Sequence, residues 1–281
     1  MNSLTMTIAK NVGFCFGVKR AIDMAHYAAK NHGKVAMLGD IVHNEIVIDD
    51  LKNSGVVVYR NIDDIPQGMP VLLRSHGTPK ELWQKARERG LTIIDATCPL
   101  VDEIHKASRL LESEGRTVII IGDSGHDEVE AIASRLSNPI VIATAKDALR
   151  LKHVRKAGVV IQSTQFIENV NQIITILISN IQDLRIINTI CTPTRDRQSQ
   201  LKELAVNNDV MIIVGSFTSA NTKRLTSISS RLNPRSYQVQ GPDDVQSGWF
   251  KDAQTVGIST GASTPDEIVR KVAKKISDLS I

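Results

Sequence analysis

Cys98-Pro-Leu-Val-Asp, followed by Val118-Ile-Ile-Ile-Gly122-Asp-Ser-Gly-His126, is one of three similar segments in this chain of 281 residues. In each segment a glycine follows the cysteine by 24 residues, and a polar side chain able to bind a ligand follows the glycine by four. The three sets are Cys15, Gly39 and His43; Cys98, Gly122 and His126; and Cys191, Gly215 and Ser219. Such fixed offsets are typical of an internal repeat. The three cysteines are therefore expected at equivalent positions in three copies of one fold.

Short apolar runs alternate with helical patterns in every copy. A strand pattern leads to each cysteine and a helical pattern follows it, over residues 18–29, 101–111 and 195–205. Parallel strands need a crossover, usually a helix, so this alternation predicts α/β domains with parallel sheets. We expect three similar small domains at 13–96, 97–189 and 190–281, with the N-terminal strand within 1–12 joining the third.

The composition is that of an ordinary soluble globular protein, with 42% apolar and 23% charged residues. Only 4% of the residues are aromatic and the net charge of +4 is spread along the chain, so no nucleic-acid partner is expected. No apolar run approaches the roughly 18 residues that span a bilayer, and no targeting signal is visible, so no membrane partner is expected. Together with three widely spaced cysteines, these features indicate a cytoplasmic protein in a reducing compartment.

Each cysteine lies between the end of a strand and the start of a helix. The helix dipole favours a thiolate at such a position. Three thiolates without a fourth could hold zinc together with a histidine, or an iron–sulfur cluster with one iron left open. Cysteines of the usual zinc sites stand two to four residues apart, and these do not. The spacing therefore favours a cluster that also serves as a catalytic centre.

A second set of polar side chains follows strand patterns in all three copies. Parallel α/β sheets bind ligands at the carboxyl ends of their strands, so these side chains are expected to face one site. They are hydrogen-bond donors of the kind that bind phosphate oxygens. The set is His43, His76, His126, Ser163, Ser219, Asn221 and Ser263.

Glu128 follows His126 by two residues. A carboxylate beside a phosphate-binding cluster could relay a proton, but an acid in the first turn of a helix could equally serve the helix dipole alone. The remaining histidines have no comparable neighbours in the sequence and are expected to be solvated. They are His26, His32, His105 and His153.

Eight short motifs occur in order along the chain. They are Gly13-Phe-Cys-Phe-Gly-Val-Lys-Arg-Ala, Val42-His-Asn, Arg74-Ser-His-Gly, Asp95-Ala-Thr-Cys-Pro-Leu-Val, Gly125-His-Asp-Glu-Val-Glu, Arg197-Gln, Val214-Gly-Ser and Gly261-Ala-Ser-Thr-Pro. Together they resemble the 4-hydroxy-3-methylbut-2-enyl diphosphate reductase family of the non-mevalonate isoprenoid pathway. The resemblance runs from about residue 12 to 268, which is nearly the whole chain.

This resemblance implies three α/β domains in a pseudo-threefold arrangement around a central 4Fe-4S cluster. Cys15, Cys98 and Cys191 would each hold one iron, and the fourth iron would be open to substrate. The resemblance also implies that Glu128 delivers a proton and that a set of polar residues binds the diphosphate. That set is His43, His76, His126, Ser219, Asn221 and Ser263.

Two positions depart from the family pattern. Ala220 stands where a serine is usual, and Ser163 stands where a threonine is usual. The first change removes one hydroxyl donor to the diphosphate. The second keeps the hydroxyl but loosens its rotamer.

By this resemblance the chain is an enzyme that reduces an allylic diphosphate. It would remove the hydroxyl of 4-hydroxy-3-methylbut-2-enyl diphosphate with two electrons and yield isopentenyl and dimethylallyl diphosphate. Since the chain has no dinucleotide fingerprint, its partner would be an electron donor protein of the ferredoxin or flavodoxin type. Two alternatives remain at this point: an iron–sulfur redox sensor that binds a phosphorylated ligand, and a structural zinc protein.

Overall fold

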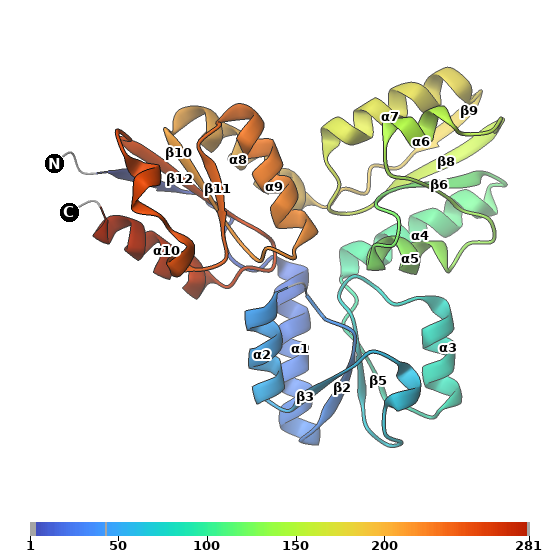
Figure 1. Cartoon of the computed structure of the whole chain (residues 1–281). Helices are drawn as coiled ribbons and strands as arrows, with labels where there is room; N and C mark the ends of the chain where they lie inside the picture. Colours follow the sequence, from blue (N-terminus) through green and yellow to red (C-terminus); the bar gives the residue numbers. More distant parts are fainter. Residues whose placement is uncertain (1–3, 43, 280–281) are drawn as a thin grey trace. The chain divides into compact units, whose positions relative to one another are not determined.

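Three separate parallel sheets of four strands each form the framework of the chain (Figure 1). The computed structural model describes residues 4–42 and 44–279. The first two sheets are each formed by one copy of the repeat, and the third is formed by the third copy together with the N-terminal strand; all strand pairs are parallel. The prediction of three similar α/β domains with parallel sheets is confirmed.

The first sheet has the order β3-β2-β4-β5. Its strands are β3 (Val56–Tyr59), β2 (Val35–Leu38), β4 (Val71–Leu73) and β5 (Ile93–Asp95). Helix α3 (Lys80–Glu88) and the short η1 turn (Ile62–Asp64) contribute to a core with alternate residues of β2 and β4.

The second sheet has the order β7-β6-β8-β9 and is buried on both faces. Its strands are β7 (Ile140–Ile142), β6 (Thr117–Ile121), β8 (Lys156–Ile161) and β9 (Asp183–Ile186). Ile119 and Ile121 of β6 pack in a core with helices α6 (Ala145–Leu149) and α7 (Ile167–Asn180). Val118 and Ile120, on the other face of β6, pack in a second core with helices α4 (Pro99–Ser113) and α5 (Asp127–Ala133). Because successive strand residues point to opposite faces, an uninterrupted apolar run serves both layers of helices.

The third sheet has the order β11-β10-β12-β1, so the first strand of the chain lies at its edge. Its strands are β11 (Ser236–Val239), β10 (Val210–Val214), β12 (Thr255–Thr260) and β1 (Thr5–Ile8), and β1 pairs with β12 from Thr5 opposite Thr255. Helices α8 (Thr192–Asn207) and α9 (Ala220–Leu232) contact this sheet, and α10 (Asp266–Asp278) completes its core. The short turns η2 (Pro242–Asp244) and η3 (Ser247–Phe250) follow β11.

The described chain divides into two compact units. One unit comprises residues 1–19, 42–51 and 192–281 and holds the third sheet, and the other comprises 20–41 and 52–191 and holds the first two sheets. Helix α1 (Phe16–His32) begins in one unit and continues in the other, as does α2 (Glu45–Asn53). The domain boundaries near 96 and 189 stay a prediction.

Equivalent backbone hydrogen bonds recur in the three copies. The N–H of each repeat glycine donates to the neighbouring strand: Gly39 to Tyr59, Gly122 to Ile142 and Gly215 to Val239, at 2.8, 3.0 and 2.8 Å. The turn that follows β4, β8 or β12 is closed in each copy by a backbone N–H that donates to the carbonyl three residues earlier. These bonds run from Gly77 to Arg74, from Gln165 to Gln162 and from Thr264 to Gly261. The repeat inferred from sequence offsets is therefore present in the hydrogen bonds of the fold.

The helices after the cysteines begin earlier than the sequence pattern predicted. Helix α4 starts at Pro99, directly after Cys98, whereas the apolar pattern placed its start at Val101. Proline suits the first position of a helix because its fixed φ is helical and the missing N–H has no partner there in any case. The cysteines consequently lie at the helix starts themselves.

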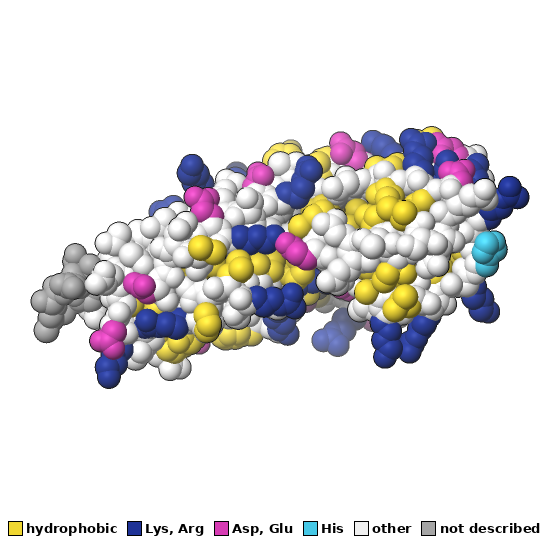
Figure 2. All heavy atoms as spheres, turned by 90° about the horizontal axis from the view of Figure 1, so that it is seen from above, with side chains coloured by type: hydrophobic (Ala, Val, Ile, Leu, Met, Phe, Trp, Pro, Cys, Tyr) yellow, Lys and Arg dark blue, Asp and Glu magenta, His cyan; other side chains and the backbone are white. Residues whose placement is uncertain are grey.

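No helix in the described parts of the chain is long and apolar enough to cross a bilayer. Figure 2 shows Lys and Arg side chains at scattered positions on the face that it draws, with acidic and apolar side chains among them.

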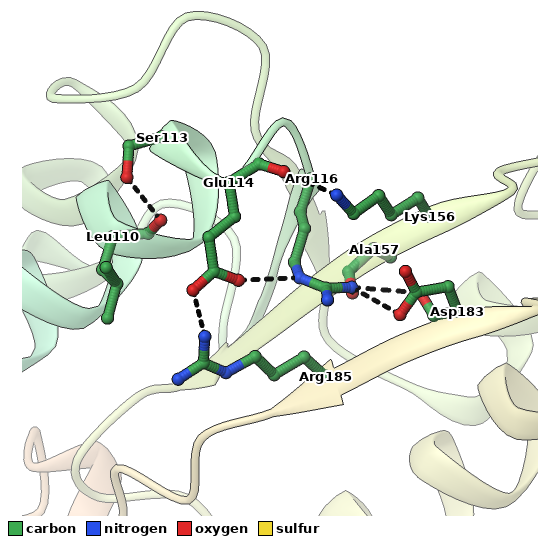
Figure 3. Close-up of polar contacts among 8 residues, drawn as sticks. All are labelled: Leu110, Ser113, Glu114, Arg116, Lys156, Ala157, Asp183 and Arg185. Carbon is green, nitrogen blue, oxygen red and sulfur yellow. Dashed lines mark hydrogen bonds and ion pairs between the residues drawn. The ribbon is translucent and has the colours of Figure 1, made fainter.

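A network of ion pairs lies beside the first residues of β6, β8 and β9 (Figure 3). Arg116 donates to Glu114 Oε2 at 2.9 Å and to Asp183 Oδ1 at 2.7 Å, while Arg185 pairs with the other oxygen of Glu114. Lys156 Nζ donates to the Glu114 carbonyl at 2.6 Å. Hydrogen bonds from the arginines hold the pKa of Glu114 below its usual range, and Arg116 does the same for the pKa of Asp183. The network links edge strand β9 to the end of α4.

We expect Arg116→Gln to lower the thermal unfolding midpoint slightly at low ionic strength, because it removes both ion pairs of Arg116. The difference from the unmodified chain should shrink in about 1 M NaCl, where exposed charges are screened. Lys152→Gln, which removes an exposed charge near β8, is the control. Equal midpoints for the two variants at low salt would show that the network contributes no stability.

Candidate functional site

Each cysteine is held by the same backbone hydrogen bond. The Cys98 N–H donates to Ser75 O at 2.9 Å, the Cys191 N–H to Ser163 O at 3.1 Å, and the Cys15 N–H to Ala262 O at 3.0 Å. Each acceptor lies in the turn at the carboxyl end of β4, β8 or β12. All three thiols are half-buried. A cysteine is thus tied, in each copy, to the turn that carries predicted ligand-binding side chains.

The second unit brings together two of the predicted histidines. His126 is the N-cap of α5, and its Nδ1 accepts from the Glu128 N–H at 3.1 Å. The His76 ring lies edge-on to the His126 ring with their centroids 5.9 Å apart. Because Nδ1 of His126 is an acceptor, its neutral imidazole carries the proton on Nε2 and can donate from that side.

Glu128 is buried and accepts two hydrogen bonds from one residue. The Ser163 N–H donates to Glu128 Oε1 at 2.6 Å, and the Ser163 hydroxyl donates to Oε2 at 2.7 Å. Glu128 is only 1% exposed, which makes such donors necessary because a buried carboxylate without them is costly. The Ser163 carbonyl in turn accepts from Cys191, so a single residue connects Glu128 with a cysteine.

An ion pair fixes the His76 turn to the helix of His126. Arg74 Nη1 lies 2.6 Å from Asp127 Oδ1, and both side chains are half-buried. Arg74 comes two residues before His76, and Asp127 comes directly after His126. The pair therefore holds the two histidine-bearing segments together.

The first unit contains the other predicted diphosphate ligands. Ser219 is the N-cap of α9, where its hydroxyl accepts from the Thr222 N–H at 3.3 Å, and Asn221 follows in the first turn. The turn that carries Ser263 is bonded to the end of β10 through the Gly261 N–H, which donates to Val214 O at 3.0 Å. The turns of Ser219 and Ser263 are thus neighbours. His43 lies outside the described residues.

A cavity of about 380 Å³ adjoins Cys15 in the same unit. Phe14, Phe16, Pro193 and Arg197 are among the residues that line it. Phe16 is 64% exposed, so part of the lining faces solvent.

Arg197 is a buried guanidinium whose function the sequence did not predict. Its Nη1 donates to Thr260 Oγ1 at 2.9 Å and to Gly261 O at 3.2 Å, and its Nη2 donates to Gly13 O at 2.7 Å. It therefore joins the segment before Cys15 to the turn before Ser263. The signal was its position in the helix that follows Cys191, one turn and a half after the cysteine, on the buried side.

The donor set fits an iron–sulfur cluster. Three half-buried thiols stand at helix starts, each anchored by its own backbone N–H, and cysteine thiolates are the standard ligands of such clusters. Among the described residues, no group of three or more His, Cys, Asp and Glu side chains is arranged as a metal site. Cys98 and Cys191 belong to one unit and Cys15 to the other.

The model of the family described as LytB protein matches residues 6–277. This chain belongs to the LytB protein family.

Two curated relatives of the LytB family align over nearly their whole length. A protein of Syntrophotalea carbinolica is 39% identical over 279 residues, which are 99% of this chain and 100% of the relative. One of Aquifex aeolicus is 41% identical over 278 residues, which are 97% and 96% of the two chains. Both relatives are named 4-hydroxy-3-methylbut-2-enyl diphosphate reductase.

Two solved structures are also similar to this LytB chain. One is described as (E)-4-hydroxy-3-methyl-but-2-enyl diphosphate reductase, the terminal enzyme of the non-mevalonate pathway; it is 39% identical, has a TM-score of 0.74 and aligns over 98% of this chain and 99% of its own. The other, described as the E-1-hydroxy-2-methyl-but-2-enyl-4-diphosphate reductase from Plasmodium falciparum, is 26% identical, has a TM-score of 0.92 and aligns over 98% of this chain and 88% of its own.

The expectation that His105 is solvated is wrong for this LytB chain. His105 is 2% exposed on the apolar side of α4, and a Cβ on Gly77 would lie only 3.1 Å from its Cε1. Val101, Ile104, Ser108 and Leu111 are buried on the same side at helical spacing, so the pattern itself contained the signal. Burial, helped by the charge of Arg135, lowers the pKa of His105 to about 4.

This pKa predicts that the protein loses stability in mild acid. Above pH 6.5 His105 is neutral in both states; below it the unfolded chain takes up a proton that the folded chain does not, until pH falls to about 4. At pH 5 the free energy of unfolding should be about 2 kcal/mol lower than at pH 7.5 from this residue alone. Urea unfolding of the unmodified chain and of His105→Gln at both pH values measures the effect. Equal losses in the two chains would contradict it.

Proposed function

We propose that this LytB chain removes the hydroxyl of 4-hydroxy-3-methylbut-2-enyl diphosphate as water, consuming two electrons and two protons and yielding isopentenyl and dimethylallyl diphosphate. The observation that carries the proposal is the buried connection from Glu128 through Ser163 to Cys191. Through Ser163 it connects a buried carboxyl group with a predicted metal ligand. The names of the full-length relatives support the same reaction.

Cys15, Cys98 and Cys191 are the proposed ligands of one 4Fe-4S cluster. Their equivalent positions in the repeat and their identical backbone anchors support this set. Such a cluster, when bound by three thiolates, supplies electrons one at a time and offers Lewis acidity to a hydroxyl at the iron that has no protein ligand. The backbone N–H bonds keep each cysteine in place at the start of its helix.

Neutral and cationic donors hold the diphosphate. The proposed donors are Nε2 of His126, the ring of His76, and the side chains of Ser219, Asn221 and Ser263, together with His43. Such donors match phosphate oxygens, and a fixed diphosphate fixes the allyl chain attached to it. Ala220 has no hydroxyl, so this set of diphosphate donors has one member fewer than in the family pattern, where a serine is usual at this position.

Glu128 delivers the proton. Its Oε2 accepts from the Ser163 hydroxyl, which orients the carboxyl group that gives the proton. Ser163 thus performs with its hydroxyl what a threonine would perform at this position. Glu128 is therefore the proposed catalytic acid, and Ser163 is its partner.

The electrons come from a separate redox protein of the ferredoxin or flavodoxin type. The chain has no dinucleotide fingerprint in its sequence, so a soluble nicotinamide cofactor is not the proposed direct donor.

We expect Cys98→Ser, purified without oxygen, to lose most of its iron–sulfur absorbance and its iron and sulfide content. The backbone N–H that bonds Ser75 O is unchanged by the substitution, so the fold and its circular dichroism should persist. Ser113→Ala, at the far end of α4, is the control. A Cys98→Ser spectrum identical to that of the unmodified protein would refute the ligand assignment, and zinc without sulfide in the unmodified protein would favour a structural zinc site.

Glu128→Gln should keep the cluster and lose turnover with a chemical reductant by at least about a hundredfold, the usual contribution of a general acid. The glutamine retains an oxygen for the Ser163 N–H but carries no acidic proton. Glu130→Gln, on the exposed side of the same helix, should turn over normally. Normal turnover by Glu128→Gln would exclude the proton-delivery role.

A further inference from the structure

Three consecutive carbonyl groups in the turn after β12 each accept a hydrogen bond from a different part of the first unit. Gly261 O accepts from Arg197 at 3.2 Å, Ala262 O from the Cys15 N–H at 3.0 Å, and Ser263 O from Asn44 Nδ2 at 2.8 Å. The turn that carries a proposed diphosphate ligand is therefore fixed at three adjacent points. The third of these hydrogen bonds comes from a single neutral side chain, that of Asn44.

Asn44 is buried, with 5% of its surface exposed, and both ends of its amide are used. Its Oδ1 accepts from the N–H groups of Ile46 and Val47 at 3.1 and 3.3 Å, which caps the start of α2. Its Nδ2 donates to Ser263 O, 219 residues away in the sequence. One side chain thus connects the start of α2 with the Ser263 turn.

The next residue of α2 makes a parallel connection to the Ser219 turn. Glu45 Oε1 accepts from Thr218 Oγ1 at 2.7 Å, and Thr218 directly precedes Ser219. The beginning of α2 therefore contacts both turns that carry proposed diphosphate ligands in this unit. The contact of Asn44 is the buried one, whereas Glu45 and Thr218 are exposed.

We infer that Asn44 is a positioning residue for diphosphate binding, which acts by holding the backbone of Ser263 in its binding conformation. The inference rests on the proposed function, since it takes Ser263 as a diphosphate ligand. A turn held in its bound conformation before the ligand arrives costs less to order on binding. Loss of the Asn44 donor should therefore weaken the binding of the diphosphate and leave the chemistry at the allyl end unchanged.

The decisive variant is Asn44→Ser. Serine is an N-cap as good as asparagine, so α2 keeps its cap, but its short hydroxyl cannot replace the Nδ2 donor to Ser263 O. The charge of the site also stays the same. Asn61→Ser is the matched control, because Asn61 caps η1 through the same kind of bond, from Asp63 N–H to Oδ1 at 3.1 Å, and is remote in sequence from every proposed ligand.

Inorganic pyrophosphate serves as the probe, both as a competitive inhibitor of turnover and as a ligand in direct calorimetric titration. We expect Asn44→Ser to raise KM for the substrate and the dissociation constant for pyrophosphate roughly fivefold, the effect of one net hydrogen bond. The kcat, the iron and sulfide content and the urea midpoint should stay close to those of the unmodified protein and of Asn61→Ser. This split between KM and kcat is not what general loosening of the fold would give.

Unchanged pyrophosphate affinity in a folded Asn44→Ser protein would overturn the inference, and so would a parallel fall in kcat and cluster content. If Asn44→Ser does not fold, Asn44→Asp decides, because it keeps the capping oxygen and points a second oxygen at Ser263 O; pyrophosphate affinity equal to the unmodified protein would then overturn the inference. An unmodified protein that binds pyrophosphate but does not reduce the hydroxylated diphosphate would refute the proposed function, while the affinity difference would still decide the role of Asn44.

Discussion

The hydrogen bond from each cysteine's backbone N–H to a strand-end turn is the contact on which the rest of the candidate site depends. It appears in all three copies, at 2.9 to 3.1 Å, and it connects the start of one repeat's helix with a strand end in the sheet of another repeat. A backbone bond does not depend on the side chain at either end. The three cysteines can therefore keep one position relative to their turns while the side chains of those turns differ.

Those side-chain differences decide which hydrogen bonds each turn makes. In the second copy the turn residue Ser163 uses its N–H and hydroxyl on Glu128. In the third copy the residue at the same place is Ala262, which has no hydroxyl, and the carbonyls on either side of it accept from Arg197 and Asn44. One backbone arrangement thus carries the proposed proton-delivery position in one copy and the proposed anion-binding turn in another. Function lies in the side chains placed on a fold, not in the fold itself.

The sequence predicted what depends on local periodicity and fixed offsets. The repeat of Cys, Gly and polar residue and the parallel sheets both followed from it. It did not predict the hydrogen bonds of Arg197 to Gly13 O and of Asn44 to Ser263 O, which join residues 184 and 219 positions apart. Every residue has a carbonyl group, so the sequence does not indicate which of them will accept. His105 was a different error: its helical spacing with Ile104 and Ser108 showed a buried side, but a histidine was taken to be solvated.

Each unit buries one ionisable side chain among fixed hydrogen-bond partners: Glu128 in one and Arg197 in the other. Glu128 receives its hydrogen bonds from Ser163 in one unit, and Arg197 donates to carbonyls and a hydroxyl around Gly13 and Gly261 in the other. A charge held by backbone dipoles and short side chains cannot relax far, so its surroundings are set before a ligand arrives. Preorganisation of this kind is worth most where charge changes during reaction. Each group lies near a cysteine of its own unit: Glu128 is connected through Ser163 to Cys191, and Arg197 lines the cavity that adjoins Cys15.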